Sequence, residues 1–399
     1  MEHVGTGIHR ASLVGHGNLR KLVVGYENRP ATDAELAEMG RILGELLDQG
    51  ALGLSTGLIY PPGCFAGTGE LVALAGVAAS RGKIYTSHIR GEGRNLLGAI
   101  DEVLHIAVEA GVRTQVSHLK ASGPANWHKI DEALAKIEAV RSRGFEVMAD
   151  RYPYTATNTG LDTVFRDWVH EGGSEAMLSR IVDASVRGRI LEELGEDYPA
   201  DRLSRVMISS IPDGPGKELE GRLVTAVARE RGLDPHEAVL WILSTCRGEA
   251  SAIFFSLSEE IMRRVLSLGW VMVATDATAQ VAHPPHIEGF PHPRGYGTFS
   301  KVLGRFCREE RLFPLETAIH KMTGLPARQL GLARRGTVAE GHHADLVVFD
   351  PATIRDESTY EAPHHYSSGI THVLVAGRVV LENGHLTGER PGRVLTRER

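Results

Sequence analysis

Ile84-Tyr85-Thr86-Ser87-His88-Ile89-Arg90 and, thirty residues later, Thr114-Gln115-Val116-Ser117-His118-Leu119-Lys120 decide the fold of this chain. Each is a short β-branched run that contains Ser-His near its end and follows an amphipathic helical pattern. Strands that alternate with helices at this interval favour a parallel sheet. Two such strands would present the imidazoles of His88 and His118 at their carboxyl ends, where α/β barrels hold their catalytic residues.

The same alternation continues on both sides of these runs. Thr32 to Glu35 forms a capping box that predicts a helix ending at Gly50, and Ala51–Leu58 then reads as a buried strand. Further helices are predicted over about 69–81, 95–110 and 129–143, and a strand follows over 145–150. A barrel and a doubly wound sheet both fit this spacing. No Gly-x-Gly-x-x-Gly follows a strand, which weakens a dinucleotide-binding interpretation.

The spacing is interrupted between residues 158 and 250, which we interpret as an inserted subdomain or lid with a strand over 205–209. Ser256 to Glu259 then reads as a second capping box, before a helix over about 258–268. Trp270–Asp276 is a strand that ends in a carboxylate, and a helix is expected at about 315–322. Ala344–Asp350 and Val373–Leu381, with a turn at Asn383-Gly384, indicate an antiparallel β module. The expected units are 1–157, 158–250, 251–335 and 336–399.

Composition narrows the class of protein. The 399 residues are 42% hydrophobic with a formal charge of −6, and the Lys and Arg residues are scattered, which argues against nucleic-acid binding. Cys64, Cys246 and Cys307 lie too far apart to suggest a disulfide framework or a cysteine zinc site. No run of about 18 apolar residues and no leader pattern occur, so we expect a cytoplasmic protein without a membrane partner.

Two histidines and one aspartate are the candidate metal ligands. His88, His118 and Asp276 stand at the ends of separate predicted strands, and imidazole with carboxylate is a ligand set that suits zinc. A single strand-end histidine is more often structural, so the case rests on the three together. His283 and His286 lie in a Pro-rich loop and are interpreted as ordinary loop residues.

Five motifs and the C-terminal stretch occur in the order in which one enzyme family has them. The chain resembles the D-aminoacylase, or N-acyl-D-amino-acid deacylase, family of the amidohydrolase superfamily. The motifs are Gly53–Gly63, Ser87–Glu92, Ser117–Lys120, Asp150–Tyr154 and His292–Phe299, and the C-terminal stretch is Ala344–Pro351.

The resemblance implies an α/β fold, a (β/α)8 TIM-type barrel flanked by a small β-sandwich. It implies one or two zinc ions held by His88, His118 and Asp276, with Asp276 also acting as general base and acid. The implied reaction is hydrolysis of a small N-acyl-D-amino acid to a carboxylic acid and a free D-amino acid. The residues implied around the substrate carboxylate are Tyr60, Lys120 and Arg294, and further candidate site residues are Tyr152, Thr157 and His292.

The chain also departs from the family pattern, because it contains neither His-x-His nor Gly-Asn-Cys-Gly. Ala51–Leu58 matches the fourth barrel strand of the family, so we predict a barrel incomplete at its N-terminus, with about strands four to eight and a sandwich remnant. Open sheet edges would then invite pairing with another chain, and zinc would bind substoichiometrically with little turnover. Two alternatives are a cyclic-amide hydrolase of the dihydroorotase or dihydropyrimidinase type and a non-catalytic fragment that binds a partner chain.

Overall fold

A six-stranded parallel sheet forms the centre of the protein. The computed structural model describes residues 5–284, 287 and 289–397, so His286 lies outside the described residues. The strands lie side by side in chain order, without the reversal of order that marks a doubly wound sheet, and this order fits a barrel. They are β1 (Val14–Gly15), β2 (Gly53–Gly57), β3 (Ile84–His88), β4 (Arg113–Val116), β5 (Val147–Arg151) and β9 (Val271–Val273).

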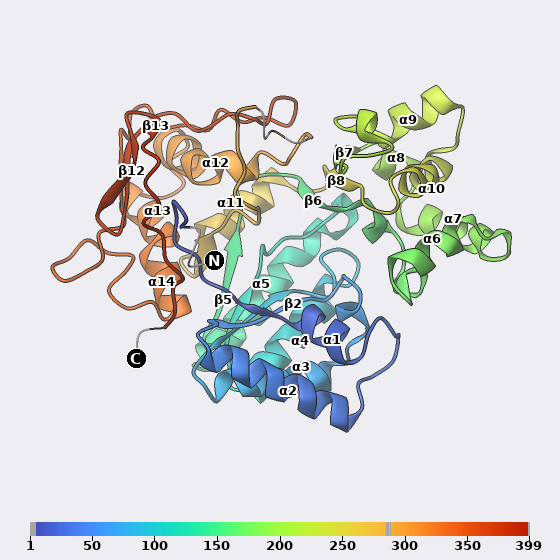
Figure 1. Ribbon diagram of the computed structural model, residues 1–399, viewed down its shortest axis with the longest axis horizontal. Helices are drawn as coiled ribbons and strands as arrows, with labels where there is room; N and C mark the ends of the chain where they lie inside the picture. Colours follow the sequence, from blue (N-terminus) through green and yellow to red (C-terminus); the bar gives the residue numbers. More distant parts are fainter. Residues whose placement is uncertain (1–4, 285–286, 288, 398–399) are drawn as a thin grey trace.

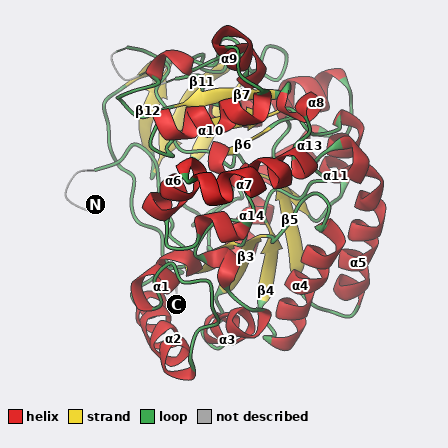
Figure 2. Ribbon diagram, turned by 90° about the vertical axis from the view of Figure 1, so that its right-hand side faces the viewer, coloured by secondary structure: helices red, strands yellow, loops and turns green. Residues whose placement is uncertain are grey.

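Amphipathic helices cover the outer side of this sheet (Figure 2). The Thr32 capping box is present in full at the start of the first of them, as predicted. The apolar faces of the helices bury Leu43, Leu71, Ile100 and Ile137 against the sheet. β2 and β3 approach closely: a Cβ atom at Gly53 would lie 2.1 Å from the carbonyl oxygen of Ile84. These helices are α2 (Asp33–Asp48), α3 (Thr68–Ala79), α4 (Leu96–Glu109), α5 (Ile130–Ser142) and α11 (Glu259–Ser267).

One strand of the sheet was not predicted. β1 pairs in parallel with β2, so the prediction that the barrel begins at Ala51–Leu58 was wrong by one strand. β1 contributes only two residues, Val14 and Gly15, and leads directly into α1 (His16–Val23). Two residues are too few to show the alternation of apolar and polar side chains by which a strand is recognised in a sequence.

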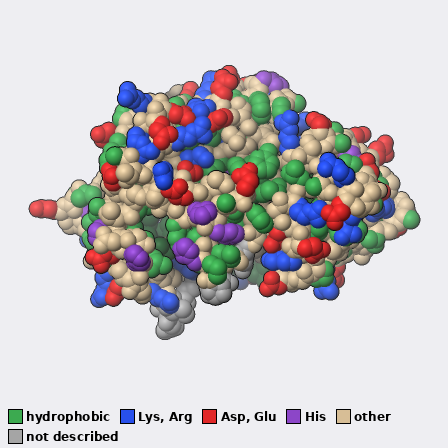
Figure 3. All heavy atoms as spheres, turned by 90° about the horizontal axis from the view of Figure 1, so that it is seen from above, with side chains coloured by type: hydrophobic (Ala, Val, Ile, Leu, Met, Phe, Trp, Pro, Cys, Tyr) green, Lys and Arg blue, Asp and Glu red, His purple; other side chains and the backbone are tan. Residues whose placement is uncertain are grey.

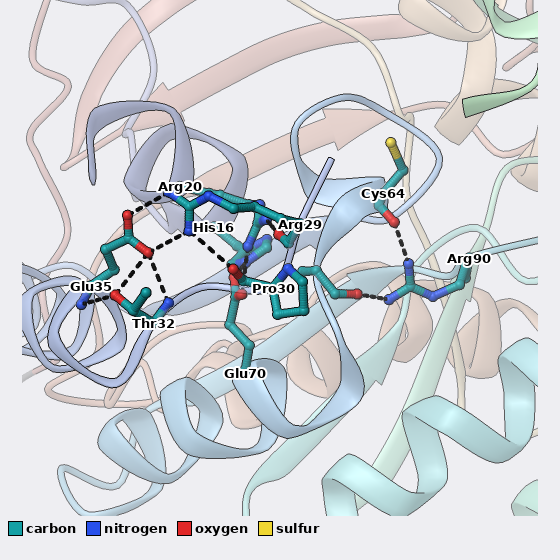
Figure 4. Close-up of polar contacts among 10 residues, drawn as sticks. His16, Arg20, Arg29, Pro30, Thr32, Glu35, Cys64, Glu70 and Arg90 are labelled. Carbon is teal, nitrogen blue, oxygen red and sulfur yellow. Dashed lines mark hydrogen bonds and ion pairs between the residues drawn. The ribbon is translucent and has the colours of Figure 1, made fainter. Parts of the chain in front are cut away.

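A buried polar cluster attaches α1 to α3. The Glu70 carboxylate lies 2.7 Å from His16 Nε2 and 2.5 Å from an Arg20 guanidinium nitrogen, and all three side chains are buried (Figure 4). Burial raises the pKa of Glu70, but the contacts with His16 and Arg20 outweigh it, so the pKa lies below its ordinary value. Arg20 also donates to the carbonyl oxygen of Arg29, which connects the cluster to the loop before α2.

The residues from β6 to β8 (157–254) build a separate body that projects from the barrel (Figure 1). A three-stranded antiparallel sheet in the order β6-β8-β7 supports a helical cluster with its own apolar core. The predicted strand at 205–209 is present as β7. The elements are β6 (Thr157–Gly160), α6 (Ser174–Val182), α7 (Ala184–Asp197), α8 (Ala200–Leu203), β7 (Val206–Ser210), α9 (Val224–Arg231), α10 (Pro235–Thr245) and β8 (Ser251–Phe254).

The predicted second capping box was wrong. α11 begins at Glu259, and its N-cap is Ser258, whose hydroxyl accepts from the Ile261 backbone N–H. The Ser256 carbonyl instead accepts from Gly123 and from the indole of Trp127, which connects this loop to the barrel.

The C-terminal part consists of helices followed by a small antiparallel sheet. The prediction of a single strand over Val373–Leu381 was wrong. The chain turns at Ala376 and Gly377, which both have positive φ, and so forms two strands. The turn at Asn383-Gly384 was predicted correctly and joins the last two strands. The elements are α12 (Arg294–Lys301), a π-helix (Val302–Glu309), α13 (Leu315–Met322), α14 (Gly324–Leu330), β10 (Leu346–Phe349), β11 (Ile370–Val375), β12 (Arg378–Glu382) and β13 (His385–Leu386).

The distribution of charged side chains on the surface agrees with the scattered Lys and Arg residues of the sequence. Basic and acidic side chains are interspersed on the face that Figure 3 presents, and neither sign forms a continuous field there. Among the described residues, no helix is long and apolar enough to cross a membrane.

Candidate metal and substrate site

The two Ser-His motifs meet at the carboxyl end of the parallel sheet. His88 is the last residue of β3, and His118 follows β4 by two residues. Their ring centroids lie 4.5 Å apart with the rings nearly perpendicular. His118 has a φ of 43°, a left-handed conformation that is uncommon for a residue other than glycine. Its backbone N–H donates to Asp150 Oδ1 over 2.8 Å, which fixes the turn at the end of β4.

Glu92 completes a cluster that the sequence analysis did not identify. Its Oε1 lies 2.9 Å from His118 Nδ1, and one ligand atom each of His88, Glu92 and His118 lie within 4.8 Å of one another. Among the described residues, this is the group of histidine and acidic side chains whose atoms converge in this way. Glu92 is the last residue of the motif Ser87–Glu92 and lies four residues after His88. This closeness to a candidate metal ligand is the feature of the sequence that could have identified it.

The donor set fits a zinc ion. His88 Nε2 is buried and has no hydrogen-bond partner in the described part of the chain, although buried polar atoms are ordinarily paired. Burial and the neighbouring His118 lower the pKa of His88 to about 3, so its imidazole is neutral, the form that binds metals. Burial raises the pKa of Glu92, but Lys120 and the two histidines outweigh it and keep the group ionised.

Asp276 lies beside this cluster but is paired with a cation. Its Oδ2 is 2.7 Å from Arg294 Nη1, and its backbone has a φ of 50°. Asp276, His88 and His118 line the same hollow, so the fold brings the three predicted metal ligands to one place. The cluster of converging ligand atoms contains Glu92 and does not contain Asp276.

Lys120 and Arg294, the predicted carboxylate ligands, are both nearly fully buried. Lys120 Nζ contacts Glu92 Oε1 at 2.5 Å and His118 Nδ1 at 2.7 Å. The Arg294 guanidinium lies 4.6 Å from the centre of the Tyr152 ring, and Lys120 Nζ lies 5.7 Å from the same centre. The hydroxyl of Tyr152 and Nε of Arg294 are buried without a hydrogen-bond partner among the described residues.

Tyr60 connects the candidate metal cluster, which consists of the side chains of His88, Glu92 and His118, to the projecting body. Its ring centroid is 5.2 Å from that of His88, and its hydroxyl is 2.9 Å from Thr159 Oγ1 in β6. Burial raises the pKa of Tyr60 to about 12, so the phenol keeps its proton. Thr157 begins β6 and pairs with Phe254 across the antiparallel ladder. No described hydrogen bond of the Thr157 side chain connects it to the metal cluster.

The hollow at the sheet end has a volume of about 520 Å³. It is bounded by Tyr60, Thr86, His88, His118 and Asp276, together with residues of α1. The chain therefore presents imidazole, carboxylate and phenol groups to one space large enough for a small organic molecule.

Comparison with known sequences places the chain among hydrolases. The model of the amidohydrolase family matches residues 9–381. The D-aminoacylase of Alcaligenes xylosoxydans xylosoxydans is 37% identical over 390 residues, which are 98% of this chain and 70% of that protein. The N-acyl-D-glutamate deacylase of the same organism is 38% identical, with 98% of this chain and 70% of that protein covered.

A solved structure has the same fold. The N-acyl-D-glutamate deacylase of Bordetella bronchiseptica superposes with a TM-score of 0.82 at 36% identity, over 98% of this chain and 72% of that one. That protein was crystallised with zinc and with a phosphonate inhibitor that mimics the tetrahedral intermediate of the reaction. The predicted fold, a TIM-type barrel with an additional C-terminal sheet, is confirmed by this likeness.

Proposed function

Because this chain belongs to the amidohydrolase family, we propose that it hydrolyses the amide bond of N-acyl-D-amino acids in a zinc-dependent reaction. Its relatives are named for that activity on D-amino acid derivatives, including D-glutamate. The observation that carries the proposal is the convergence of His88, Glu92 and His118, together with a His88 Nε2 that lacks a hydrogen-bond partner among the described residues. The similarity to deacylases of linear amides favours this reaction over the cyclic-amide alternative.

His88 and His118 would hold the zinc ion, with carboxylate oxygen from Glu92 or Asp276. When bound, zinc supplies Lewis-acid chemistry, since it lowers the pKa of water and polarises a carbonyl group. Lys120 neutralises Glu92, and Asp150 fixes the turn that carries His118. These neighbours hold the ligands in position before a metal arrives.

Asp276 is the proposed general base and acid. Its side chain is about one third exposed and borders the hollow, where it can reach a water molecule and a substrate amide. It would take a proton from the attacking water and deliver that proton to the nitrogen of the leaving amine. Arg294 holds the Asp276 carboxylate in place, which restricts its direction toward the hollow.

Arg294 and Lys120 are the proposed ligands of the substrate carboxylate. A guanidinium and an ammonium beside the same Tyr152 ring suit a carboxylate, and the buried Arg294 Nε has a donor to spare. The protonated phenol of Tyr60 adds a donor near His88. In this arrangement the amide of the substrate would face His88 and His118 while its carboxylate faces Arg294.

The proposal is tested by following hydrolysis of N-acetyl-D-amino acids and their L-enantiomers while the bound zinc is measured. We expect turnover of the D-enantiomers in proportion to bound zinc, loss of turnover with a chelator, and recovery when zinc is returned. A chain that carries zinc and hydrolyses no N-acetyl-D-amino acid would contradict the proposal. Because the chain has no His-x-His, we expect substoichiometric zinc, and one zinc per chain with robust turnover would overturn that expectation.

Two substitutions separate chemistry from binding. Asp276→Ala is expected to abolish turnover, since a general acid and base contributes about 100-fold to 10,000-fold in rate. Arg294→Ala is expected mainly to raise KM, because the guanidinium binds a group that does not react. Steady-state kinetics on one N-acetyl-D-amino acid measure both effects. An Arg294→Ala variant with unchanged KM and kcat would refute the carboxylate assignment.

A further inference from the structure

His292 is a buried histidine beside the proposed substrate-carboxylate ligand. It lies two residues before Arg294 and is 3% exposed. Its ring is surrounded edge-on by tyrosines, at centroid distances of 6.0 Å to Tyr152, 5.3 Å to Tyr154 and 5.2 Å to Tyr360. Within the described part of the chain no hydrogen bond or ring contact connects it to His88, Glu92 or His118, so it lies outside that cluster.

The hydrogen bonds of His292 identify its protonation state. The backbone N–H of Arg294 donates to Nδ1 over 3.0 Å, and a backbone N–H can only donate, so Nδ1 carries no proton. Nε2 lies 3.1 Å from the carbonyl oxygen of Ala156, which can only accept, so Nε2 carries the proton. Burial and the charge of Arg294 lower the pKa of His292 well below its ordinary value, in agreement with this neutral tautomer.

These two hydrogen bonds connect the start of α12 to the segment before β6. The adjoining strand β6 receives the side chain of Arg294, whose Nη2 donates to the carbonyl oxygen of Asn158 over 3.3 Å. Arg294 is therefore held at its backbone through His292 and at its guanidinium by Asn158, Asp276 and the Tyr152 ring. A movement of the Arg294 backbone would displace the guanidinium from this position.

We propose that His292 is a positioning residue for recognition of the substrate carboxylate: its neutral imidazole holds Arg294 against the Ala156–Asn158 segment. The inference rests on the proposed function, since it takes the N-acyl-D-amino acid carboxylate as the ligand of Arg294. The imidazole itself contacts neither the hollow nor the metal cluster in the described structure. Its effect is exerted through the location of the guanidinium.

Two substitutions of His292 separate positioning from simple packing. His292→Leu fills the space but removes both hydrogen bonds, whereas His292→Asn places an amide oxygen near the position of Nδ1 and can accept from Arg294. We expect His292→Leu to raise KM for an N-acetyl-D-amino acid about tenfold, with a smaller change in kcat, because the backbone of Arg294 loses the hydrogen bond that holds it. His292→Asn should recover most of the increase in KM. Thermal melting of each variant reports the fraction folded.

The decisive measurement is a double-mutant cycle with Arg294→Ala. If His292 acts through the guanidinium, His292→Leu adds no further increase in KM when Arg294 is already alanine. Equal increases in both backgrounds, or a KM unchanged in the folded single variant, overturn the inference while the proposed function stands. A wild-type chain without zinc-dependent hydrolysis of N-acetyl-D-amino acids overturns both.

Discussion

Glu92 lies at the centre of the contacts that form the candidate metal site. It contacts the ring of His118 and the ammonium of Lys120 at once, so a single carboxylate connects a proposed metal ligand to a proposed substrate ligand. A half-buried carboxylate with such neighbours is ionised and ready to bind a cation. Zinc binding is therefore expected to depend on Glu92.

We expect Glu92→Gln to weaken zinc binding about tenfold to 100-fold, the usual effect of losing a neighbour that orients or supplements metal ligands. The amide keeps the shape of the side chain but removes the charge that balances Lys120. Competition with a chromophoric chelator measures the affinity. Glu45→Gln, on the exposed face of α2, is the control and should bind zinc like the wild type. Equal affinities for both variants would remove Glu92 from the site.

Site residues could be predicted where a short sequence motif on a repeated αβ unit marks them. The Ser-His ends of β3 and β4 lie on repeated αβ units, so their convergence follows from the parallel sheet alone. Glu92 lies on the loop after β3, and only the fold brings its carboxylate to His118. The ion pair between Asp276 and Arg294 joins the loop after β9 to the first residue of α12, and no sequence period relates these two positions.

At the scale of elements, β1 and α1 are held in place by buried polar contacts together with apolar packing. β1 has two residues, and the helix after it buries His16 and Arg20 against Glu70 of α3. Val14, Leu19 and Val24 pack into the apolar core of the sheet, and the ion pairs add to this attachment. The length of β1 also explains why it escaped the sequence analysis, whereas α2, with a full capping box and sixteen residues, did not.

Glu70→Gln is expected to destabilise the protein by about 3 to 5 kcal/mol, because it leaves Arg20 buried without a carboxylate. The pKa of Glu70 is lowered in the folded state, so its contribution is present above the unfolded value and is lost as the pH falls through the folded pKa. Urea unfolding at about pH 7 and about pH 3 measures the difference between wild type and variant, which should shrink at the lower pH.

The exposed pair of Glu38 and Arg41 on α2 supplies the control for this experiment. Glu38→Gln removes an ion pair that lies in solvent, where such pairs contribute little. It should leave the unfolding curve nearly unchanged at both pH values. A Glu70 variant that behaves like this control would mean that the buried cluster contributes nothing to attachment of α1.

The whole molecule contains separate apolar cores. The sheet and its helices bury one, and the projecting body between β5 and β9 buries another, built from residues such as Leu161, Leu194 and Leu240. The chain enters the projecting body through β6 and leaves it after β8, which pair with each other. This topology favours local unfolding of the body without loss of the barrel sheet.

Leu240→Ala, at a fully buried position of α10, is expected to cost about 2 to 5 kcal/mol within the projecting body. Hydrogen exchange followed by mass spectrometry should show faster exchange in peptides from 161–254 and little change in β3 and β4. Leu71→Ala, an equally buried position of α3, is the matched control and should accelerate exchange in the sheet. Identical exchange patterns for the two variants would show one cooperative unit.

The ends of the parallel sheet bear on how the molecule behaves at high concentration. In the described structure the sheet ends in β1 on one side and β9 on the other, with two and three residues respectively. Open edges were expected to invite pairing with another chain, but a border this brief offers few free N–H and C=O groups to an incoming strand. Short edge strands are one of the devices by which natural sheets resist edge-to-edge association. The two outermost strands therefore offer an incoming chain only a short border along which to pair.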